Sequence, residues 1–369
     1  MSDTAVIFGG PSPEHDVSVL TGLQVTRALS TTGTERIRAL YWTKTGDWFE
    51  VAPDLEGEAF VEGVPTGSTP LRLEADAGGG FQARAALTGR PRPLDISAVV
   101  VCCHGGPGED GTLQSALDLA GVRYTGPTAA GAALGMDKLA FAGLAIAAGL
   151  PTLPRILLTD AARPDFPGPY IVKPRFGGSS IGIEVVEDLA TATARLLNNA
   201  HLRRGAVVEP YRPDLFDLNV SVRSWPEVKL SAVERPIRSQ ASSDILSYAD
   251  KYVGGEGMAS APRELPAELD SGLEARLTEA AHLVARLVDL RGVARIDFLS
   301  DGKELFVNEV NTVPGSMAKY LWVAPPVAFS TLLTDMLAEA LARPSVQHLA
   351  VGADGAVLRS AGSIASKLA

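Results

Sequence analysis

Residues 295–322 read RIDFLSDGKELFVNEVNTVPGSMAKYLW, and this stretch decides the fold that we expect. Two apolar runs of alternating polarity, 296–299 and 305–310, flank an Asp301-Gly302 pair, a pattern typical of a β-hairpin. Side chains alternate between the two faces of a strand, so a hairpin of this length can bring Asp297 opposite Glu309. The sequence therefore predicts two carboxylates side by side on one face of a sheet.

This predicted hairpin gathers oxygen-bearing side chains. Asn311 points to the same face as Glu309, because the two residues are two positions apart. Adjacent carboxylates repel each other unless a cation lies between them, and oxygen ligands with an amide favour a hard ion such as Mg²⁺ or Mn²⁺. Taken alone, the stretch leaves two interpretations open: a metal site formed by Asp297, Glu309 and Asn311, or a charged hairpin end that faces solvent.

Composition excludes several classes of protein. A chain of 369 residues with 46% hydrophobic and 21% charged residues can form two or three domains. A net charge of −10 and a pI near 5.1 are not those of a nucleic-acid-binding protein. No signal peptide opens the sequence, and no run approaches the ~18 apolar residues that span a bilayer, so we expect a cytoplasmic protein without a membrane partner. Cys102 and Cys103 are predicted to be small apolar strand residues.

The chain begins with a strand, a glycine-rich turn and a helix. Residues 5–8 are apolar, the turn carries Glu14, and a helical pattern follows over 17–29. Such a turn at the edge of a parallel sheet exposes backbone N–H groups to a ligand. The G-x-G-x-x-G fingerprint is absent, which disfavours a nicotinamide dehydrogenase. Glu14 is either a ligand contact or a solvated loop residue.

A second unit of the same kind follows. Residues 96–103 form a predicted buried strand, His104 and a run of glycines follow it, and a helix is expected over 112–120. Repeated units of this kind predict half of a doubly wound domain over 1–127. A lone histidine after a strand is more often structural than catalytic, but the flanking glycines allow a ligand to approach the backbone here.

The middle of the chain contains a glycine- and hydroxyl-rich loop. Residues 175–182, RFGGSSIG, follow a predicted strand that carries Lys173. Backbone N–H groups and the hydroxyls of such a loop can cover phosphates, while the lysine supplies a point charge. Further on, Glu209 and Asp217 could bind adenine and ribose or could be charges at a sheet edge, and their spacing does not decide between these roles.

Residues 239–263 break the periodicity before the hairpin. They carry Lys251 and Tyr252 among small residues, and we predict a lid that closes over a reactive phosphoryl group. A long helix over 269–288 then leads to the hairpin, and one more helix is expected over 326–341.

Taken in order, these pieces resemble the D-alanine-D-alanine ligase family of ATP-grasp enzymes, over about residues 4–342. The resemblance rests on ordered motifs: VIFGGPSPEHDVS, HGGPGEDGTLQ, MDKL, VKPRFGGSSIG, YADKY, RIDF and NEVNTVPG. It implies an α/β ATP-grasp fold with three domains: an N-terminal doubly wound parallel sheet over 1–127, and central and C-terminal α+β domains over 128–212 and 213–369 that hold ATP between them. It also implies two Mg²⁺ ions, with Mn²⁺ as an alternative, and a homodimer formed through the N-terminal domain.

The resemblance implies a role for each candidate residue. Those expected to bind ATP are Lys138, Lys173, Ser179, Ser180, Glu209, Asp217 and Lys251, and the expected metal ligands are Asp297, Glu309 and Asn311. Glu14 would hold the ammonium group of the first amino acid, supported by Ser179, Tyr252 and His104. Arg295, together with a backbone N–H near Gly315, would stabilise the tetrahedral oxyanion.

One departure from the family pattern concerns the second amino acid. The family has a Ser-Leu pair after Pro-Gly, and its serine binds the carboxylate of the acceptor. Here Tyr320 takes that position, between Lys319 and Leu321. The default product is D-alanyl-D-alanine for peptidoglycan. The alternative is a dipeptide or amide ligase that uses another acceptor in natural-product or antibiotic biosynthesis. A nucleotide-binding regulator without chemistry is disfavoured, because a mere binder does not need Arg295.

Overall fold

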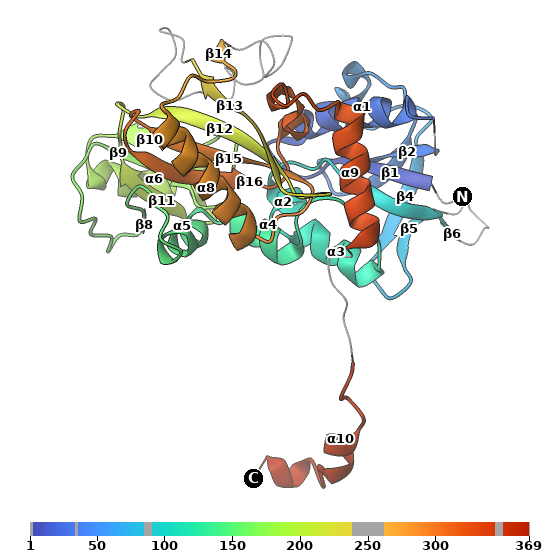
Figure 1. The fold of residues 1–369 in the computed structure, drawn as a ribbon. Coiled ribbons are helices and arrows are strands. Elements are labelled where there is room, and N and C mark those ends of the chain that lie inside the picture. Colours follow the sequence, from blue (N-terminus) through green and yellow to red (C-terminus); the bar gives the residue numbers. More distant parts are fainter. Residues whose placement is uncertain (1–2, 34–35, 85–90, 238–261, 344–349, 369) are drawn as a thin grey trace.

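The computed structural model describes residues 3–33, 36–84, 91–237, 262–343 and 350–368, which are arranged around three β-sheets (Figure 1). The N-terminal sheet has the order β6-β5-β4-β3-β2-β1-β7, formed by β1 (Asp3–Gly9), β2 (Ile37–Trp42), β3 (Trp48–Val51), β4 (Thr69–Glu74), β5 (Gly80–Ala83), β6 (Arg92–Pro93) and β7 (Ile96–Val101). β1 pairs in parallel with β2 and β7, and the other neighbours pair antiparallel. The predicted α/β class is confirmed. The sheet is mixed: short loops join β2 to β3 and β4 to β5, and such loops suit antiparallel pairing.

Period-two alternation in β1 builds a core on each face of this sheet. Val6 and Phe8 pack in one core with α1 (His15–Ser30) and α9 (Phe329–Ala342), and Ala5 and Ile7 pack in the other with α3 (Thr112–Ala120). The short α2 (Gly106–Glu109) precedes α3. Figure 1 shows α9, from the far end of the chain, beside α1. A C-terminal helix thus completes the N-terminal core.

The second sheet is small and antiparallel. It has the order β10-β9-β11-β8, formed by β8 (Ile156–Leu157), β9 (Tyr170–Pro174), β10 (Glu184–Val186) and β11 (Ala206–Pro210), and α6 (Leu189–Asn198) packs on it. The chain reaches this sheet through α4 (Ala129–Met136) and α5 (Lys138–Ala147). Asp137 separates these helices, because its side chain accepts the N–H groups of Leu139 and Ala140 and so caps α5.

The third sheet contains the predicted hairpin. It has the order β14-β13-β12-β15-β16, formed by β12 (Phe216–Arg223), β13 (Lys229–Pro236), β14 (Arg263–Glu264), β15 (Val293–Ser300) and β16 (Leu305–Asn311). Asp297 lies opposite Glu309, so the predicted register is confirmed. Val220 and Ile296 on one face pack against α8 (Ser271–Leu287), which leaves the other face to the polar side chains.

The remaining elements are short: the 3₁₀ turns η1 (Gly57–Phe60), η2 (Ala200–Leu202), η4 (Gly315–Leu321) and η5 (Ala365–Lys367), and the helix α10 (Ala356–Ser360). Within the described ranges, the helices are too short or too polar for any of them to cross a bilayer. The predicted lid, 239–263, lies outside the described residues except for its last two. The boundaries of the three domains stay predictions.

Candidate active site

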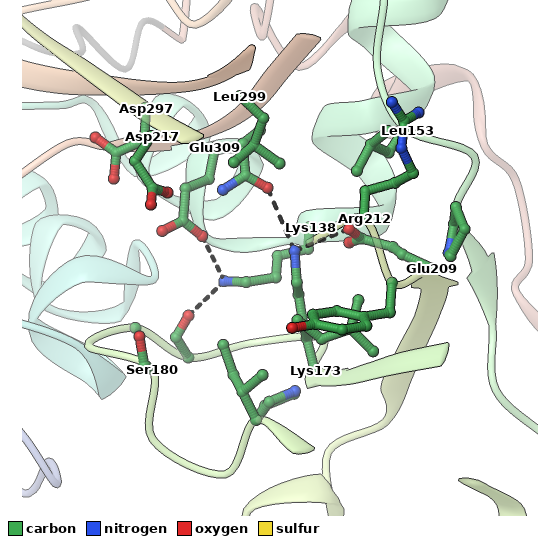
Figure 2. A pocket seen from close by; sticks show the side chains of 18 of the residues that line it. Lys138, Leu153, Lys173, Ser180, Glu209, Arg212, Asp217, Asp297, Leu299 and Glu309 are labelled. Atoms are coloured by element: carbon green, nitrogen blue, oxygen red, sulfur yellow. Dashed lines mark hydrogen bonds and ion pairs between the residues drawn. The ribbon is translucent and has the colours of Figure 1, made fainter. Parts of the chain in front are cut away.

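A cleft between the second and third sheets gathers residues that are far apart in the sequence (Figure 2). Strands of both sheets line it, and its walls include the candidates Lys138, Lys173, Ser180, Glu209, Asp217, Asp297 and Glu309. Lysines and carboxylates alternate around this space, so the cleft can hold an anionic group together with a cation.

Lys138 lies between the glycine-rich loop and the hairpin. Its Nζ is 3.1 Å from Glu309 Oε2 and donates to the carbonyl oxygen of Gly177 at 2.5 Å. The Asp137 cap sets its position as the first residue of α5. Asp137 is held in turn by Arg175, and although burial alone would raise the pKa of Asp137, the Arg175 hydrogen bonds keep it below its ordinary value. The amine therefore points into the cleft from a fixed helix end.

The Glu209 carboxylate is enclosed by two cations. Arg155 Nε donates to one oxygen at 2.6 Å and Lys173 Nζ donates to the other at 2.8 Å, and the Glu209 side chain is fully buried. Burial alone would raise the pKa of Glu209, but the two positive charges outweigh it and hold the pKa below its ordinary value. One oxygen thus fixes Arg155 and the other fixes Lys173, and a contact of Glu209 with adenosine stays a prediction.

Arg155 was missed by the sequence interpretation. Its side chain is 2% exposed, and it also donates to the backbone carbonyls of Lys138 and Asn308. It therefore connects three walls of the cleft. The only signal was a single arginine inside an otherwise apolar stretch, LPTLPRILL, over 150–158.

The three predicted metal ligands lie together on one face of β15 and β16. Arg295 forms two hydrogen bonds to the Asp297 carboxylate, at 2.6 and 2.7 Å, and the Asn311 amide donates to Asp297 at 3.0 Å. No group of three His, Cys, Asp or Glu side chains in the described part of the chain could hold a metal ion. Two carboxylates and an amide still fit a hard cation whose other ligands come from a bound phosphate or water.

A second, smaller cavity adjoins the cleft. Its lining includes Glu14, His104, Ser179, Arg295, Glu309 and Gly315. The Ser179 hydroxyl donates to the Glu14 carboxylate, and their shared role in holding an ammonium group stays a prediction. Gly105 allows this approach, because a side chain there would overlap the Glu14 carboxylate. A carboxylate and a guanidinium in one polar cavity suit the ammonium and carboxylate groups of an amino acid.

His104 lines this cavity with both ring nitrogens engaged. Nδ1 is 2.8 Å from the Val313 carbonyl oxygen, and Nε2 is 2.8 Å from Thr21 Oγ1. Burial lowers its pKa to about 4, so the ring is neutral at neutral pH. Glu109 is a further buried residue of the cavity; it belongs to the HGGPGEDG motif, but the sequence interpretation assigned it no role.

The predicted acceptor residues lie in η4. The Tyr320 hydroxyl donates to Glu234 at 3.4 Å, and the guanidinium of Arg263 lies 5.0 Å from the centre of the Tyr320 ring. Lys319 Nζ lies 4.8 Å from the centre of the Phe329 ring, and burial lowers the pKa of this lysine. Leu321 is fully buried. Lys251 and Tyr252 lie outside the described residues, so their predicted roles are not placed.

The three sheets, with a lysine-lined cleft between the second and third, define an ATP-grasp ligase fold. Comparison with known proteins narrows this class. The family model "D-ala D-ala ligase N-terminus" matches residues 3–127, and "D-ala D-ala ligase C-terminus" matches residues 157–338. The chain therefore belongs to the D-alanine-D-alanine ligase family.

Individual relatives agree over nearly the whole chain. The D-alanine-D-alanine ligase of Bradyrhizobium sp. ORS 278 is 31% identical, and that of Mycobacterium bovis BCG is 32% identical; each match covers 92% of this chain and 95% of the relative. Two solved structures share the fold. The Helicobacter pylori D-alanine-D-alanine ligase has a TM-score of 0.70 at 23% identity, covering 94% of this chain and 100% of that one. The VanG D-Ala:D-Ser ligase of Enterococcus faecalis has a TM-score of 0.74 at 24% identity, covering 92% and 99%.

Proposed function

We propose that the chain joins the carboxylate of one D-alanine to the amine of a second in an ATP-dependent reaction that supplies D-alanyl-D-alanine for peptidoglycan. The observation that carries this proposal is that Glu309 lines both the cleft and the adjoining cavity. A nucleotide phosphate in the cleft would therefore border an amino-acid carboxylate in the cavity. The names and coverage of the relatives support D-alanine as the substrate.

In the first step, Glu14 would bind the ammonium group of the donor amino acid. One carboxylate oxygen of the donor attacks the γ-phosphorus of ATP, the bond to ADP breaks, and an acyl phosphate forms. Lys138 and Lys173 would offset the negative charge of the phosphates, mainly by being held in position. Asp297, Glu309 and Asn311 would hold Mg²⁺, which when bound neutralises phosphate charge.

In the second step, the deprotonated amine of the acceptor attacks the acyl carbon and forms the C–N bond. The carbonyl oxygen becomes an oxyanion, which Arg295 and a backbone N–H near Gly315 would stabilise. Inorganic phosphate then leaves with the electron pair of its bond to carbon, the nitrogen releases one proton to the phosphate or to water, and an amide remains. Both groups line the cavity that contains Glu14, which is where the donor carboxylate would lie.

The test is phosphate release from ATP and Mg²⁺ with D- and L-amino acids, singly and in pairs, with the products identified by mass. Release with D-alanine alone, together with the dipeptide mass, is the expected result. Release only with a different pair would overturn the D-alanyl-D-alanine assignment and favour another acceptor, with Tyr320 at the centre of the changed site. ATP binding without turnover for any pair would reduce the chain to a nucleotide-binding protein.

The assigned role of Arg295 has its own test. Arg295→Ala should lower kcat on the order of 10²–10³-fold, because a donor to the developing oxyanion is lost. Arg38→Ala is the matched control, since Arg38 is also a partly buried arginine paired with carboxylates, in the N-terminal sheet. Near-normal turnover in Arg295→Ala would remove this residue from the mechanism.

The cytoplasmic location and the homodimer that we expect for this chain stay predictions.

A further inference from the structure

The backbone that follows the hairpin is held by side chains of the N-terminal sheet's own helices and loops. Glu109 Oε1 accepts the N–H of Val313 at 3.0 Å, and His104 Nδ1 lies 2.8 Å from the carbonyl oxygen of the same residue. The N–H of Ser316 is bound by Thr21 Oγ1 at 3.1 Å. The backbone on both sides of Gly315 is therefore held by three side chains: Thr21 of α1, His104 of the loop after β7, and Glu109 of α2.

The hydrogen bonds in this group have only one consistent direction. A carbonyl can only accept, so His104 Nδ1 carries the proton that is donated to Val313. The neutral ring must then accept at Nε2, so the hydroxyl of Thr21 donates to it. This orientation leaves a lone pair of the Thr21 oxygen facing the N–H of Ser316. One chain of bonds thus runs from Ser316 through Thr21 and His104 back to Val313.

Glu109 closes the arrangement from the other side. Its second oxygen accepts the N–H of Gly105 at 3.0 Å, so a single carboxylate joins the loop after β7 to Val313, two residues beyond the end of β16. The residue is 8% exposed, and each carboxylate oxygen faces an N–H donor. The same loop includes Gly105, which packs against the Glu14 carboxylate. The donor site and the Val313 backbone are therefore positioned by one structural unit.

The segment between these anchors has a strained backbone. Ser316, Met317 and Ala318 have φ values of 49°, 51° and 48°, in the left-handed region that is unfavourable for residues with a Cβ. Three such residues in succession do not persist unless their surroundings impose them. Here the Thr21 bond holds the start of the turn, and Met317 is buried in the core shared with α1.

We infer that Thr21, His104 and Glu109 are positioning residues that aim the backbone N–H at Gly315 toward the oxyanion of the peptide-forming step. The inference rests on the proposed function, because it requires an oxyanion at that place. A donor stabilises the transition state only if it is fixed before the charge develops. A displacement of about 1 Å can cost about 10²-fold in rate. His104 therefore acts through the backbone of Val313, and its link to the donor amino acid is indirect.

Thr21→Val is the decisive variant, because valine keeps the shape of the side chain and removes both hydrogen bonds. Thr26→Val is its matched control: Thr26 is buried on the same helix, but its hydroxyl bonds only the carbonyl of Gly22 within that helix. We expect Thr21→Val to lower kcat for dipeptide synthesis by about 10- to 100-fold while KM for ATP stays within about twofold. Thr26→Val should keep the wild-type kcat.

A second measurement distinguishes a misplaced backbone N–H at Gly315 from a general distortion of the folded protein. A phosphinate analogue of the dipeptide, whose tetrahedral oxygens mimic the oxyanion, should bind Thr21→Val at least about tenfold more weakly, with donor D-alanine binding unchanged. Glu109→Gln should likewise weaken binding of the analogue and leave donor binding unchanged. The glutamine amide has one oxygen to accept an N–H, whereas the Glu109 carboxylate accepts one N–H at each of two oxygens. Glu339→Gln is its control, since buried Glu339 accepts the Gly292 N–H away from the site.

Equal kcat values and equal analogue affinities in Thr21→Val and Thr26→Val would overturn the inference. A parallel loss of ATP, donor and analogue binding in Thr21→Val would also overturn it, because that pattern indicates general distortion. Failure of the wild-type protein to form any dipeptide would instead refute the proposed function. The two failures are therefore distinguishable in one set of assays.

Discussion

Two buried glutamates, one in the cleft between the second and third sheets and one in the adjoining cavity, are surrounded in opposite ways. Glu209 is enclosed by Arg155 and Lys173, and these charges hold its pKa below the ordinary value. Among the described residues, Glu109 is bonded only to two backbone N–H groups; burial, followed by the charges of Glu14 and Glu309, raises its pKa to about 7. Burial is comparable in the two cases, so the partners decide the charge.

The difference matches what each carboxylate is placed to do. Glu209 has fixed charge partners, and it holds Lys173 where the proposed function would place nucleotide phosphates. Glu109 holds a piece of backbone, for which hydrogen-bond geometry matters more than net charge. Glu209 thus acts in the cleft through charge pairs, and Glu109 acts in the cavity through hydrogen bonds to the backbone.

Removing a cation from the cleft should have the largest effect. Arg155→Met leaves the Glu209 carboxylate buried with a single partner and removes two bonds to backbone carbonyls. We expect the free energy of unfolding to fall by about 3–5 kcal/mol, measured by urea denaturation at pH 7. Arg212→Met is the control, because its pair with Asp214 is partly exposed, at 33% and 51% of the two side chains, and should be worth less than about 1 kcal/mol. Similar losses in both variants would contradict the description of Glu209.

Titration should distinguish the cavity from the cleft. Folding raises the pKa of Glu109 from its ordinary value of 4.5 to about 7, so the folded protein keeps a proton that the unfolded chain has released. This stabilisation is fully present below pH 4.5 and is lost as the pH rises through about 7. The unfolding free energy of the wild type, relative to Glu109→Gln, should therefore fall by about 3 kcal/mol across that window. Parallel curves for the two proteins would refute the raised pKa.

The smallest effect concerns the coupling between two carboxylates of the cavity. The charge of Glu14 is the second cause of the raised pKa of Glu109, so Glu14→Gln should move the midpoint of the Glu109 titration to lower pH. A double-mutant cycle of these two residues at pH 8 should give a coupling of about 0.5–1 kcal/mol. The exposed Glu58 serves as a control in place of Glu14 and should show no coupling.

The hairpin was predictable because its signals are local. Alternating polarity and the Asp301-Gly302 turn are enough to place Asp297 opposite Glu309, and the structure has this register. The ordered motifs assigned Glu14 and Ser179 to one substrate group, and the structure brings these residues into contact although they are 165 positions apart. Patterns within a strand or a family motif carry this kind of information.

Arg155 and Glu109 were not assigned because their partners come from other parts of the chain. Glu109 bonds a backbone group 204 positions away, and Arg155 bonds one 153 positions away. Nearly all residue types carry the same backbone N–H and carbonyl groups, so the residue sequence does not indicate which of them accept or donate these bonds. The left-handed turn at Ser316–Ala318 is likewise imposed by tertiary contacts, since these residues do not favour it.

The shared core between the N-terminal sheet and α9 has a consequence for synthesis on the ribosome. The face of the sheet that carries Val6 and Phe8 is covered in part by Val313, Leu332 and Met336, which are translated more than 300 positions later. At a translation rate of ~5–20 residues per second, this apolar face stays exposed for many seconds before the residues that cover it are synthesised. The growing chain is therefore most open to chaperone binding and to aggregation along this face, and a nascent chain that stops before α9 cannot bury it.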